Sequence, residues 1–460
     1  MSGQIAVEKV TQAQSELDKL AQDIWEHPEE PFRETYACQQ VAAFLKREGF
    51  SVEVGAGNVP TAIRATWGEG HPVMGLLGEY DALPALSQKV TDHKEPLVEG
   101  GYGHGCGHNL LAATTVGAAI GMKAEMEAKH IPGTIVFYGC PAEELLTGKP
   151  FMAREGCFRD LDIALAWHPG KMNVASAQGT CGCNSVKFHF KGVTAHAAYN
   201  PWDGRSALDA VSLLNSGVEF MREHINPEVR IHYVITEGGT APNIVPDQAT
   251  VWYYVRALQR DLVDDVYNRL VRAAKGAAMM TDTEVEVEFL GGCYPRRDNR
   301  VIAGVLDEAM RSIPFEELTE EENALARGLN MHAQKQWKNA VKNFGFSEDT
   351  QVYQGVAPIM DGYSYDSSDV GDVGHIVPTG FFFTATYNLG SVGHSWQATA
   401  CAGSPIGRKA MHYGAKAMAM AGIRLMESEE LREKAMDEFL KDTGGRDNYC
   451  CPIPADMELP

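Results

Sequence analysis

The sequence has no uninterrupted apolar run of about 18 residues, the length that a membrane-spanning helix needs. The N-terminal segment MSGQIAVEKVTQAQSELDKL is polar and helix-like, and it lacks the apolar core of a signal peptide. Low-complexity tracts are missing as well, and the composition is that of an ordinary soluble enzyme. We therefore expect a cytoplasmic protein that has no membrane partner.

Basic residues are scarce relative to acidic ones. The 460 residues include 40 lysines and arginines against 61 aspartates and glutamates, so the formal net charge is −21. A surface with this charge repels nucleic acids and anionic membranes on average. We therefore expect no nucleic acid among the partners.

Cysteines are few for a disulfide-stabilised protein, with ten in 460 residues. Cys181 and Cys183 are too close in sequence for ordinary pairing, and Cys450 and Cys451 are adjacent. We expect most of these thiols to be free and buried, where they act as small apolar groups. Cys106 is the exception, because it lies among glycines and between two histidines.

The chain is too long for one compact core, so two domains are expected. Strand-like runs at 73–78, 133–139 and 161–167 alternate with helical stretches at about 109–129 and 151–158. This alternation predicts an α/β fold with a mixed, mostly parallel sheet flanked by helices. Two more amphipathic helices are expected near the N-terminus, over residues 8–25 and 35–48.

The pattern changes between residues 184 and 292. Strands and helices are expected there in the order 186–190, 204–223, 231–236, 250–254, 261–277 and 285–289. This β-α-β-β-α-β order is typical of a self-contained sheet covered by two helices. We therefore predict one discontinuous domain, residues 1–183 and 293–460, with residues 184–292 inserted as a second domain.

Four segments that are far apart in the chain offer metal-binding side chains. They are Gly-His-Gly-Cys-Gly-His-Asn (103–109), Pro-Ala-Glu-Glu (141–144), Trp-His-Pro (167–169) and Gly-His-Ser (393–395). One thiol, several imidazoles and adjacent carboxylates suit zinc or a similar divalent ion. Asp81 and the segments 141–144 and 167–169 follow or end strand-like runs, and functional groups collect at the carboxyl ends of parallel strands.

Each segment also has an ordinary structural explanation. The glycines around Cys106 suit tight turns or a phosphate-binding loop, although the Gly-Lys-Ser/Thr of that loop is missing. Glu143 and Glu144 suit a solvated helix start, where the helix dipole favours acidic side chains. His168 and His394 suit ordinary turns. The joint occurrence of all four segments favours a metal site.

Adjacent carboxylates allow a division of labour. One carboxylate of Glu143–Glu144 can bind a metal ion while its neighbour stays free to move a proton, which metal-assisted hydrolysis requires. In a competing interpretation Cys106 is a nucleophile paired with His108. That mechanism leaves the two carboxylates and the distant histidines unexplained.

The motifs, taken in order, resemble those of the dinuclear-metal peptidases and amidohydrolases. They are Gly-Glu-Tyr-Asp-Ala-Leu-Pro (78–84), Cys-Gly-His-Asn (106–109), Pro-Ala-Glu-Glu (141–144), His168 and Gly-His-Ser (393–395). The Cys-x-His variant is similar to the branch that cleaves amino-acid conjugates. The resemblance implies a divalent metal cofactor and a small-molecule substrate, an N-acyl or N-aroyl amino acid. Cleavage of its amide bond would release a free amino acid.

The resemblance also implies roles for particular residues. The implied metal ligands are Cys106, His108, Glu144, His168 and His394. Glu143 matches the general acid/base of the family, and Asp81 matches the carboxylate that orients a ligand. Residues 184–292 are similar to the lid and dimerisation domain of the family, which implies a homodimer.

Three residues of the inserted domain also match the family pattern. His196, in Gly-Val-Thr-Ala-His-Ala, matches a histidine that reaches a neighbouring subunit's site and stabilises the oxyanion. Asn243 and Arg256 match groups that hold the substrate carboxylate. A buried histidine and an arginine at a strand end are the ordinary explanations for these positions.

Asn109 departs from the pattern of many relatives, which have aspartate at this position. Asparagine is a poorer anionic ligand, so we expect one or two metal ions per subunit, with the Cys106 thiolate as an alternative bridging anion. The thiolate favours zinc, and the nitrogen and oxygen ligands also suit manganese.

Two other functions fit the resemblance, namely a dipeptidase of the same family and a non-catalytic relative that binds conjugates. The presence of Glu143 argues against the second, because binding alone needs no proton transfer.

Overall fold

A computed structural model describes residues 2–460, which divide into two compact units. Of these residues, the first unit comprises 2–178, Arg297–Gly362 and Asp372–Pro460, and the second comprises Gly179–Arg296 and Tyr363–Gly371. Among the described residues, no helix is both long and apolar enough to cross a membrane.

The first unit is built on a mixed seven-stranded sheet with the order β1-β2-β4-β3-β5-β11-β6. The strands are β1 (Ser51–Val54), β2 (Ile63–Glu69), β3 (Val73–Glu79), β4 (Gly133–Cys140), β5 (Ile163–Gly170), β6 (Val174–Ser176) and β11 (Thr379–Ala385). The neighbours β4-β3, β3-β5 and β5-β11 are parallel, whereas the outer pairs are antiparallel. The four central strands therefore present their carboxyl ends at one edge of the sheet.

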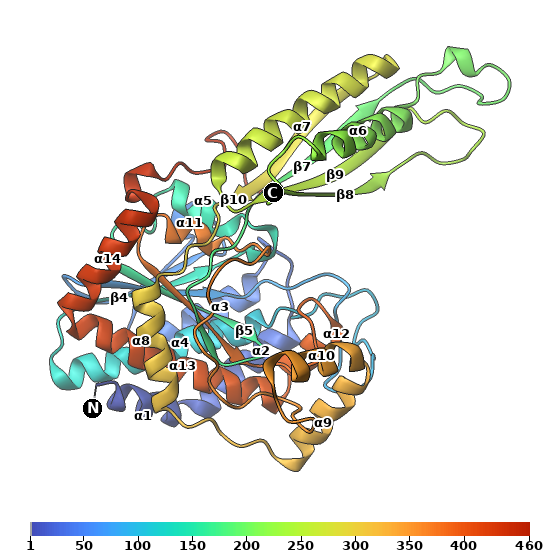
Figure 1. The fold of residues 1–460 in the computed structure, drawn as a ribbon. Coiled ribbons are helices and arrows are strands. Elements are labelled where there is room, and N and C mark those ends of the chain that lie inside the picture. The colour runs from blue at the N-terminus through green and yellow to red at the C-terminus, as the bar shows by residue number, and fades with distance from the viewer. Residues whose placement is uncertain (1) are drawn as a thin grey trace. The chain divides into compact units, whose positions relative to one another are not determined.

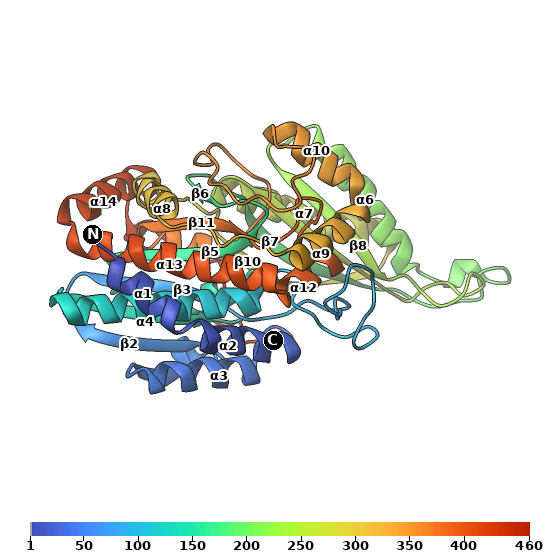
Figure 2. The same cartoon turned by 90° about the horizontal axis from the view of Figure 1, so that it is seen from below.

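The helices of the first unit lie on and around this sheet, with α3, α4, α8 and α13 directly against its strands (Figures 1 and 2). They are α1 (Gln4–Gln12), α2 (Gln14–Glu26), α3 (Thr35–Arg47), α4 (His108–Lys129), α5 (Gly148–Arg154), α8 (Arg300–Ser312), α9 (Glu320–Met331), α10 (Gln334–Phe344), α12 (Trp396–Ala402), α13 (Pro405–Glu427) and α14 (Glu429–Thr443). Short 3-10 turns are η1 (Ala56–Asn58), η2 (Glu143–Leu145) and η4 (Arg446–Asn448), and the short helix α11 (Val370–Gly374) begins in the second unit and ends in the first. The predicted α/β architecture is confirmed.

Helix α4 is the centre of the core, because it lies against β3 on one side and against α1 and α13 on the other (Figure 2). Two glycines allow this close packing. A Cβ at Gly121 would lie 2.9 Å from the carbonyl oxygen of Ala6, and one at Gly117 would lie 3.1 Å from Cβ of Ala415. Larger side chains would push α4 away from its neighbours, and its first residue, His108, would move with it.

The N-terminal helix predicted over residues 8–25 is instead two helices. α1 starts at Gln4, and Ala13 separates α1 from α2 with φ −86° and ψ 0°. Both helices keep their apolar sides on the same core, through residues such as Val10 and Leu17. The apolar pattern therefore runs across the break, which explains why the sequence did not reveal it.

The second unit is a four-stranded antiparallel sheet, in the order β10-β7-β9-β8, with α6 and α7 on one face (Figure 1). Its elements are β7 (Gly182–Lys191), η3 (Pro201–Asp203), α6 (Ala207–Arg222), β8 (Arg230–Glu237), β9 (Gln248–Ala257), α7 (Arg260–Thr281) and β10 (Glu284–Cys293). Alternate residues of the strands, such as Phe188 and Tyr253, bury their side chains beneath the helices. The β-α-β-β-α-β order is as predicted.

The second unit extends a few residues beyond 184–292 at both ends, and a distant segment joins it. Residues Tyr363–Gly371 pair with the chain just before β7. The backbone N–H of Ser364 donates to the carbonyl of Gly179, and the backbone N–H of Cys181 donates to the carbonyl of Asp366. Both hydrogen bonds are 2.9 Å long. Local sequence patterns cannot predict a backbone pairing between segments more than a hundred residues apart.

Candidate metal centre

The predicted site residues of the first unit lie at the carboxyl edge of the parallel strands. Asp81 follows β3, Glu143 and Glu144 follow β4 in η2, and His168 lies near the end of β5. His108 is the first residue of α4, and Cys106 precedes it by two residues. The topology of the first unit therefore brings together residues that are far apart in the sequence.

Glycine at position 107 shapes the loop that carries Cys106. Gly107 has φ +76°, and a Cβ there would lie 2.9 Å from both Pro169 Cγ and Tyr387 Oη. A side chain would be strained in this left-handed conformation and would also collide with the chain beside His168. The glycine thus lets Cys106 and His168 come close together.

The loop carrying the glutamate pair is fixed by a buried carboxylate. Ala142 has φ +55°, and its backbone N–H donates to Glu34 Oε1 at 2.9 Å. Glu34 also accepts hydrogen bonds from the backbone of Phe32 and the hydroxyl of Thr61. Burial, followed by the charge of Asp81, raises the pKa of Glu34 to about 7. Sequence reasoning missed this contact, because nothing local marks residue 34 as a partner of residue 142.

His394 reaches the other donors through a backbone contact. Its N–H donates to the carbonyl of Gly105 at 3.0 Å, and its own φ is +58°. The Nε2 atom of His394 lies 3.3 Å from Glu144 Oε2. The C-terminal part of the first unit is thereby joined to the loop that carries Cys106.

The five predicted ligands form two groups of three that share Cys106. One group is Cys106, His108 and His168, and the other is Cys106, Glu144 and His394, with all donor atoms of a group within 4.8 Å of one another. Within the first group, Sγ of Cys106 lies 3.3 Å from Nε2 of His168. Two adjacent donor sets with a common sulfur suit two cations.

Asp81 connects the two groups. Its Oδ1 accepts a hydrogen bond from His108 Nδ1, and its Oδ2 accepts one from the backbone N–H of Glu144, both at 2.9 Å. The first contact places the proton of His108 on Nδ1 and leaves the lone pair of Nε2 available. His168 is oriented in the same way, because its Nδ1 lies 2.8 Å from the carbonyl oxygen of Pro169.

The buried atoms at the centre fit a cation. Three of them have no hydrogen-bond partner among the described residues, namely Glu79 Oε2, His108 Nε2 and Glu144 Oε1. Burial raises the pKa of Glu144 to about 7, with opposing effects of His108, which lowers it, and Asp81, which raises it. Burial and the Glu144 carboxylate also raise the pKa of the Cys106 thiol. Burial favours the protonated forms of this thiol and this carboxylate, whereas a bound cation would stabilise their ionised forms.

Asn109 and His104 have structural roles. The side-chain amide of Asn109 donates to the carbonyls of Ala21 and Ala402, at 3.2 and 3.1 Å. An aspartate could not make these two contacts, because it has no hydrogen to donate. His104 lies with its Nε2 3.1 Å from the carbonyl of Ile24, and burial lowers its pKa to about 3.

The three residues predicted from the inserted domain lie in the second unit. His196 and Asn243 are neighbours, because the N–H of Ala197 donates to the carbonyl of Asn243 at 3.0 Å. Arg256 lies near the far end of β9, where it donates to the hydroxyl of Ser367 at 3.1 Å. Strand β9 spans about 30 Å at roughly 3.3 Å per residue. Within one chain, Asn243 and Arg256 are therefore not brought together.

Sequence reasoning gave no role to Glu79 or Lys149. Glu79 ends β3, and together with His108 and Glu143 it forms a third group of possible metal donors. Lys149 is completely buried and forms an ion pair with Glu79. Glu79 lies inside the family motif 78–84, so the sequence could have identified it as a candidate. No local pattern predicts burial of Lys149.

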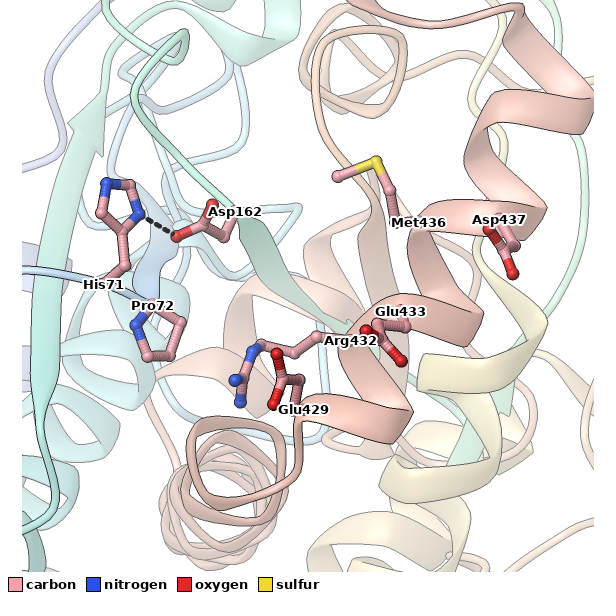
Figure 3. Close-up of a pocket in the computed structure, with 8 residues that line it drawn as sticks. All are labelled: His71, Pro72, Asp162, Glu429, Arg432, Glu433, Met436 and Asp437. Carbon is pink, nitrogen blue, oxygen red and sulfur yellow. Dashed lines mark hydrogen bonds and ion pairs between the residues drawn. The ribbon is translucent and has the colours of Figure 1, made fainter.

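A cavity of about 510 Å³ lies at the opposite end of the same strands (Figure 3). It is lined by His71, Pro72, Asp162, Glu429, Arg432, Glu433, Met436 and Asp437. His71 and Pro72 precede β3 and Asp162 precedes β5, whereas Asp81 follows β3 and His168 lies near the end of β5. The cavity is therefore separate from the candidate metal centre.

Comparisons with known proteins agree with this geometry. Residues 178–279 match the family model of the peptidase dimerisation domain. The chain is 37% identical to one of the subunits of p-aminobenzoyl-glutamate hydrolase of Escherichia coli K12 over 455 residues, which cover 95% of this chain and 94% of that protein. A dinuclear metal binding peptidase of the M20 family from Bacillus subtilis shares the fold with a TM-score of 0.58 and 17% identity, covering 91% of this chain and 99% of that one.

The chain belongs to the M20 family. As an M20 protein it is a metal-dependent hydrolase of amide bonds, as the motifs indicated. It is also 29% identical to Xaa-Arg dipeptidase of Mus musculus, over 94% of this chain and 91% of that protein.

Proposed function

We propose that the chain hydrolyses an N-acyl or N-aroyl amino acid of the p-aminobenzoyl-glutamate type at a centre of two divalent metal ions. The observation that carries the proposal is the pair of three-donor groups that share Cys106. Cys106, His108, Glu144, His168 and His394 would hold the ions. The thiolate favours zinc, and manganese is the alternative. When bound, the ions would polarise the amide carbonyl and acidify a water molecule.

Glu143 is the proposed general acid/base. Its carboxylate is buried beside the donors, with Oε2 4.0 Å from His108 Nε2. It would accept a proton from the attacking water and later donate that proton to the leaving nitrogen. Asp81 would keep His108 oriented throughout.

The test compares two neighbouring glutamates. Glu143→Gln should lower kcat by about 10²–10⁴-fold while metal content stays at the wild-type value, whereas Glu144→Gln should lower both. Turnover is measured on aryl-acyl, fatty-acyl and dipeptide conjugates, after EDTA treatment and after zinc or manganese is added back. Near-normal turnover of Glu143→Gln would show that the assigned role is wrong.

We also propose that each catalytic site draws on two subunits. Asn243 and His196 lie at one end of the second unit and Arg256 lies at the other, so one chain cannot supply both groups to one substrate. His196 and Asn243 would serve the partner's site, where His196 stabilises the oxyanion and Asn243 contacts the substrate. Arg256 would bind the substrate carboxylate.

Mixed dimers test this arrangement. His196→Ala and Glu143→Gln should each be inactive as homodimers. After the two variants are mixed and exchanged, roughly a quarter of the sites in a symmetric dimer population should combine an intact Glu143 with an intact partner histidine. Failure of activity to return, with subunit exchange verified by mass, would contradict the shared site.

The edge strand β8 is the proposed dimer contact. Tyr233, Val234 and Ile235 expose 41%, 53% and 42% of their surface on this strand. Pairing with β8 of a second copy would bury these apolar groups and satisfy the free edge. Val234→Lys should halve the mass measured by light scattering. Val54→Lys, on the exposed edge strand β1 of the first unit, is the matched control and should leave the mass unchanged.

A dipeptidase is the second candidate, favoured by the likeness to Xaa-Arg dipeptidase along almost the whole chain. The dipeptides in the substrate panel distinguish it, because a dipeptidase would prefer them to aryl-acyl and fatty-acyl conjugates. The cytoplasmic location remains a prediction from the sequence.

A further inference from the structure

Glu79 presents a buried carboxylate oxygen to the candidate metal centre. Its side chain is almost completely enclosed, with the residue 3% exposed at the end of β3. Oε2 of Glu79 lies 3.5 Å from His108 Nε2 and has no hydrogen-bond partner among the described residues. A carboxylate oxygen in such a place is strongly destabilised unless a proton or a cation is next to it.

The ion pair with Lys149 accounts for one oxygen of the buried Glu79 carboxylate, Oε1. It does not account for the position of the other oxygen, Oε2, opposite His108. Lys149 Nζ contacts Glu79 Oε1 and its side chain is completely buried. This contact balances one charge and orients the carboxylate. Oε2 of Glu79 faces the imidazole of His108, whose Nδ1 already makes a hydrogen bond to Asp81.

The separation between the two atoms fits ligands of one ion. Donors bound at about 2.0–2.3 Å with tetrahedral angles lie about 3.3–3.8 Å apart. The 3.5 Å between Glu79 Oε2 and His108 Nε2 falls in this range. Two other separations of 3.3 Å also fall in this range, namely Cys106 Sγ to His168 Nε2 and Glu144 Oε2 to His394 Nε2. Two lone-pair atoms that face each other at this distance are well placed to share a cation.

We propose that Glu79 is a sixth protein ligand, on the His108 side of the metal centre, and that Lys149 holds it in place. The inference rests on the proposed metal centre. Lys149 is then a positioning residue, and it also limits the negative charge that the ion must balance.

Removing the charges singly and together tests the assignment. Metal content per chain is measured by elemental analysis and zinc affinity by competition with a chromophoric chelator, so neither readout depends on activity. Glu79→Gln should weaken binding of one ion by about 10–100-fold. The double variant Glu79→Gln/Lys149→Met, which removes the ion pair without leaving an unpaired buried charge, should bind zinc as weakly as Glu79→Gln.

The matched control is Glu125→Gln. Glu125 is also a buried glutamate paired with a lysine, at 2.6 Å from Lys129, but it lies near the other end of α4 from His108. The zinc affinity of the Glu125→Gln variant should equal that of the wild type. Thermal melting of the metal-free proteins verifies that each variant is folded.

Two outcomes would overturn the inference. One is wild-type zinc affinity in the double variant, which would make the ion pair purely structural, and the other is unchanged affinity in Glu79→Gln. The proposed function fails separately, if the wild type binds no stoichiometric metal or if His108→Ala binds as much as the wild type.

Discussion

Replacing Asp81 with asparagine removes one acceptor from a residue that accepts two hydrogen bonds. Oδ1 of Asp81 accepts from His108 Nδ1, and Oδ2 accepts from the N–H of Glu144. Asparagine has one carbonyl oxygen, so its amide group must face one of these two donors. If it faces His108, the imidazole proton moves to Nε2 and blocks metal binding. If it faces Glu144, a buried N–H loses its partner.

Both arrangements are unfavourable by a similar amount. An unsatisfied buried donor costs about 1–3 kcal/mol. Loss of a carboxylate that orients a metal-bound histidine lowers metal affinity by about 10–100-fold, which corresponds to about 1.4–2.7 kcal/mol. We therefore expect Asp81→Asn to bind zinc about 10–100-fold more weakly than the wild type, as measured by chelator competition. Turnover at limiting zinc should fall in proportion.

Asp162→Asn is a closely matched control. Asp162 also contacts a histidine and a backbone N–H, those of His71 and Val73, both at 2.7 Å. These contacts lie at the cavity of Figure 3, at the other end of β3. This variant should keep wild-type zinc affinity. An Asp81→Asn protein whose zinc affinity is within twofold of the wild type would refute the role assigned to Asp81.

Three other substitutions give distinct results. Cys106→Ala should bind fewer than one zinc ion per chain, because its sulfur belongs to both donor groups, whereas Cys38→Ala, which removes another buried thiol, should bind as many as the wild type. Gly148→Ala should lower the melting temperature by several degrees, since a Cβ would lie 1.6 Å from the carbonyl oxygen of Pro141. Glu34 has a pKa raised from 4.5 to about 7, so the folded state binds its proton more tightly than the unfolded state. The unfolding free energy of the metal-free protein should therefore fall by up to about 3 kcal/mol as the pH rises from about 4.5 to 7. Urea titrations should show this slope in the wild type and a reduced slope in Glu34→Gln.

The sequence predicted those parts of the fold that depend on local patterns. The alternation of apolar runs and helical stretches placed β3, β4, β5 and α4 to within a few residues. It also predicted the order of elements in the second unit. Contacts between distant segments were not predictable, such as the pairing of Ser364 with Gly179.

The same distinction applies to the site. Cys106, His108, Glu144, His168 and His394 were recognisable because their residue types have specific chemistry, and the structure brings them together. Glu34 acts through Ala142, and Lys149 acts through Glu79, so their contributions depend on tertiary contacts. Single-sequence reasoning has no means to find such indirect partners.

The five metal ligands recognised in the sequence are distributed between residues 106 and 394, and the hydrogen bond from His394 to Gly105 joins the two ends of this range. During translation, the ribosome must therefore complete most of the polypeptide before the last imidazole becomes available. Until then, the nascent chain holds a thiol, two histidines and a carboxylate without their full set of neighbours. The donor group of Cys106, Glu144 and His394 is consequently completed only late in synthesis, and a product truncated before residue 394 would be left with an incomplete binding site.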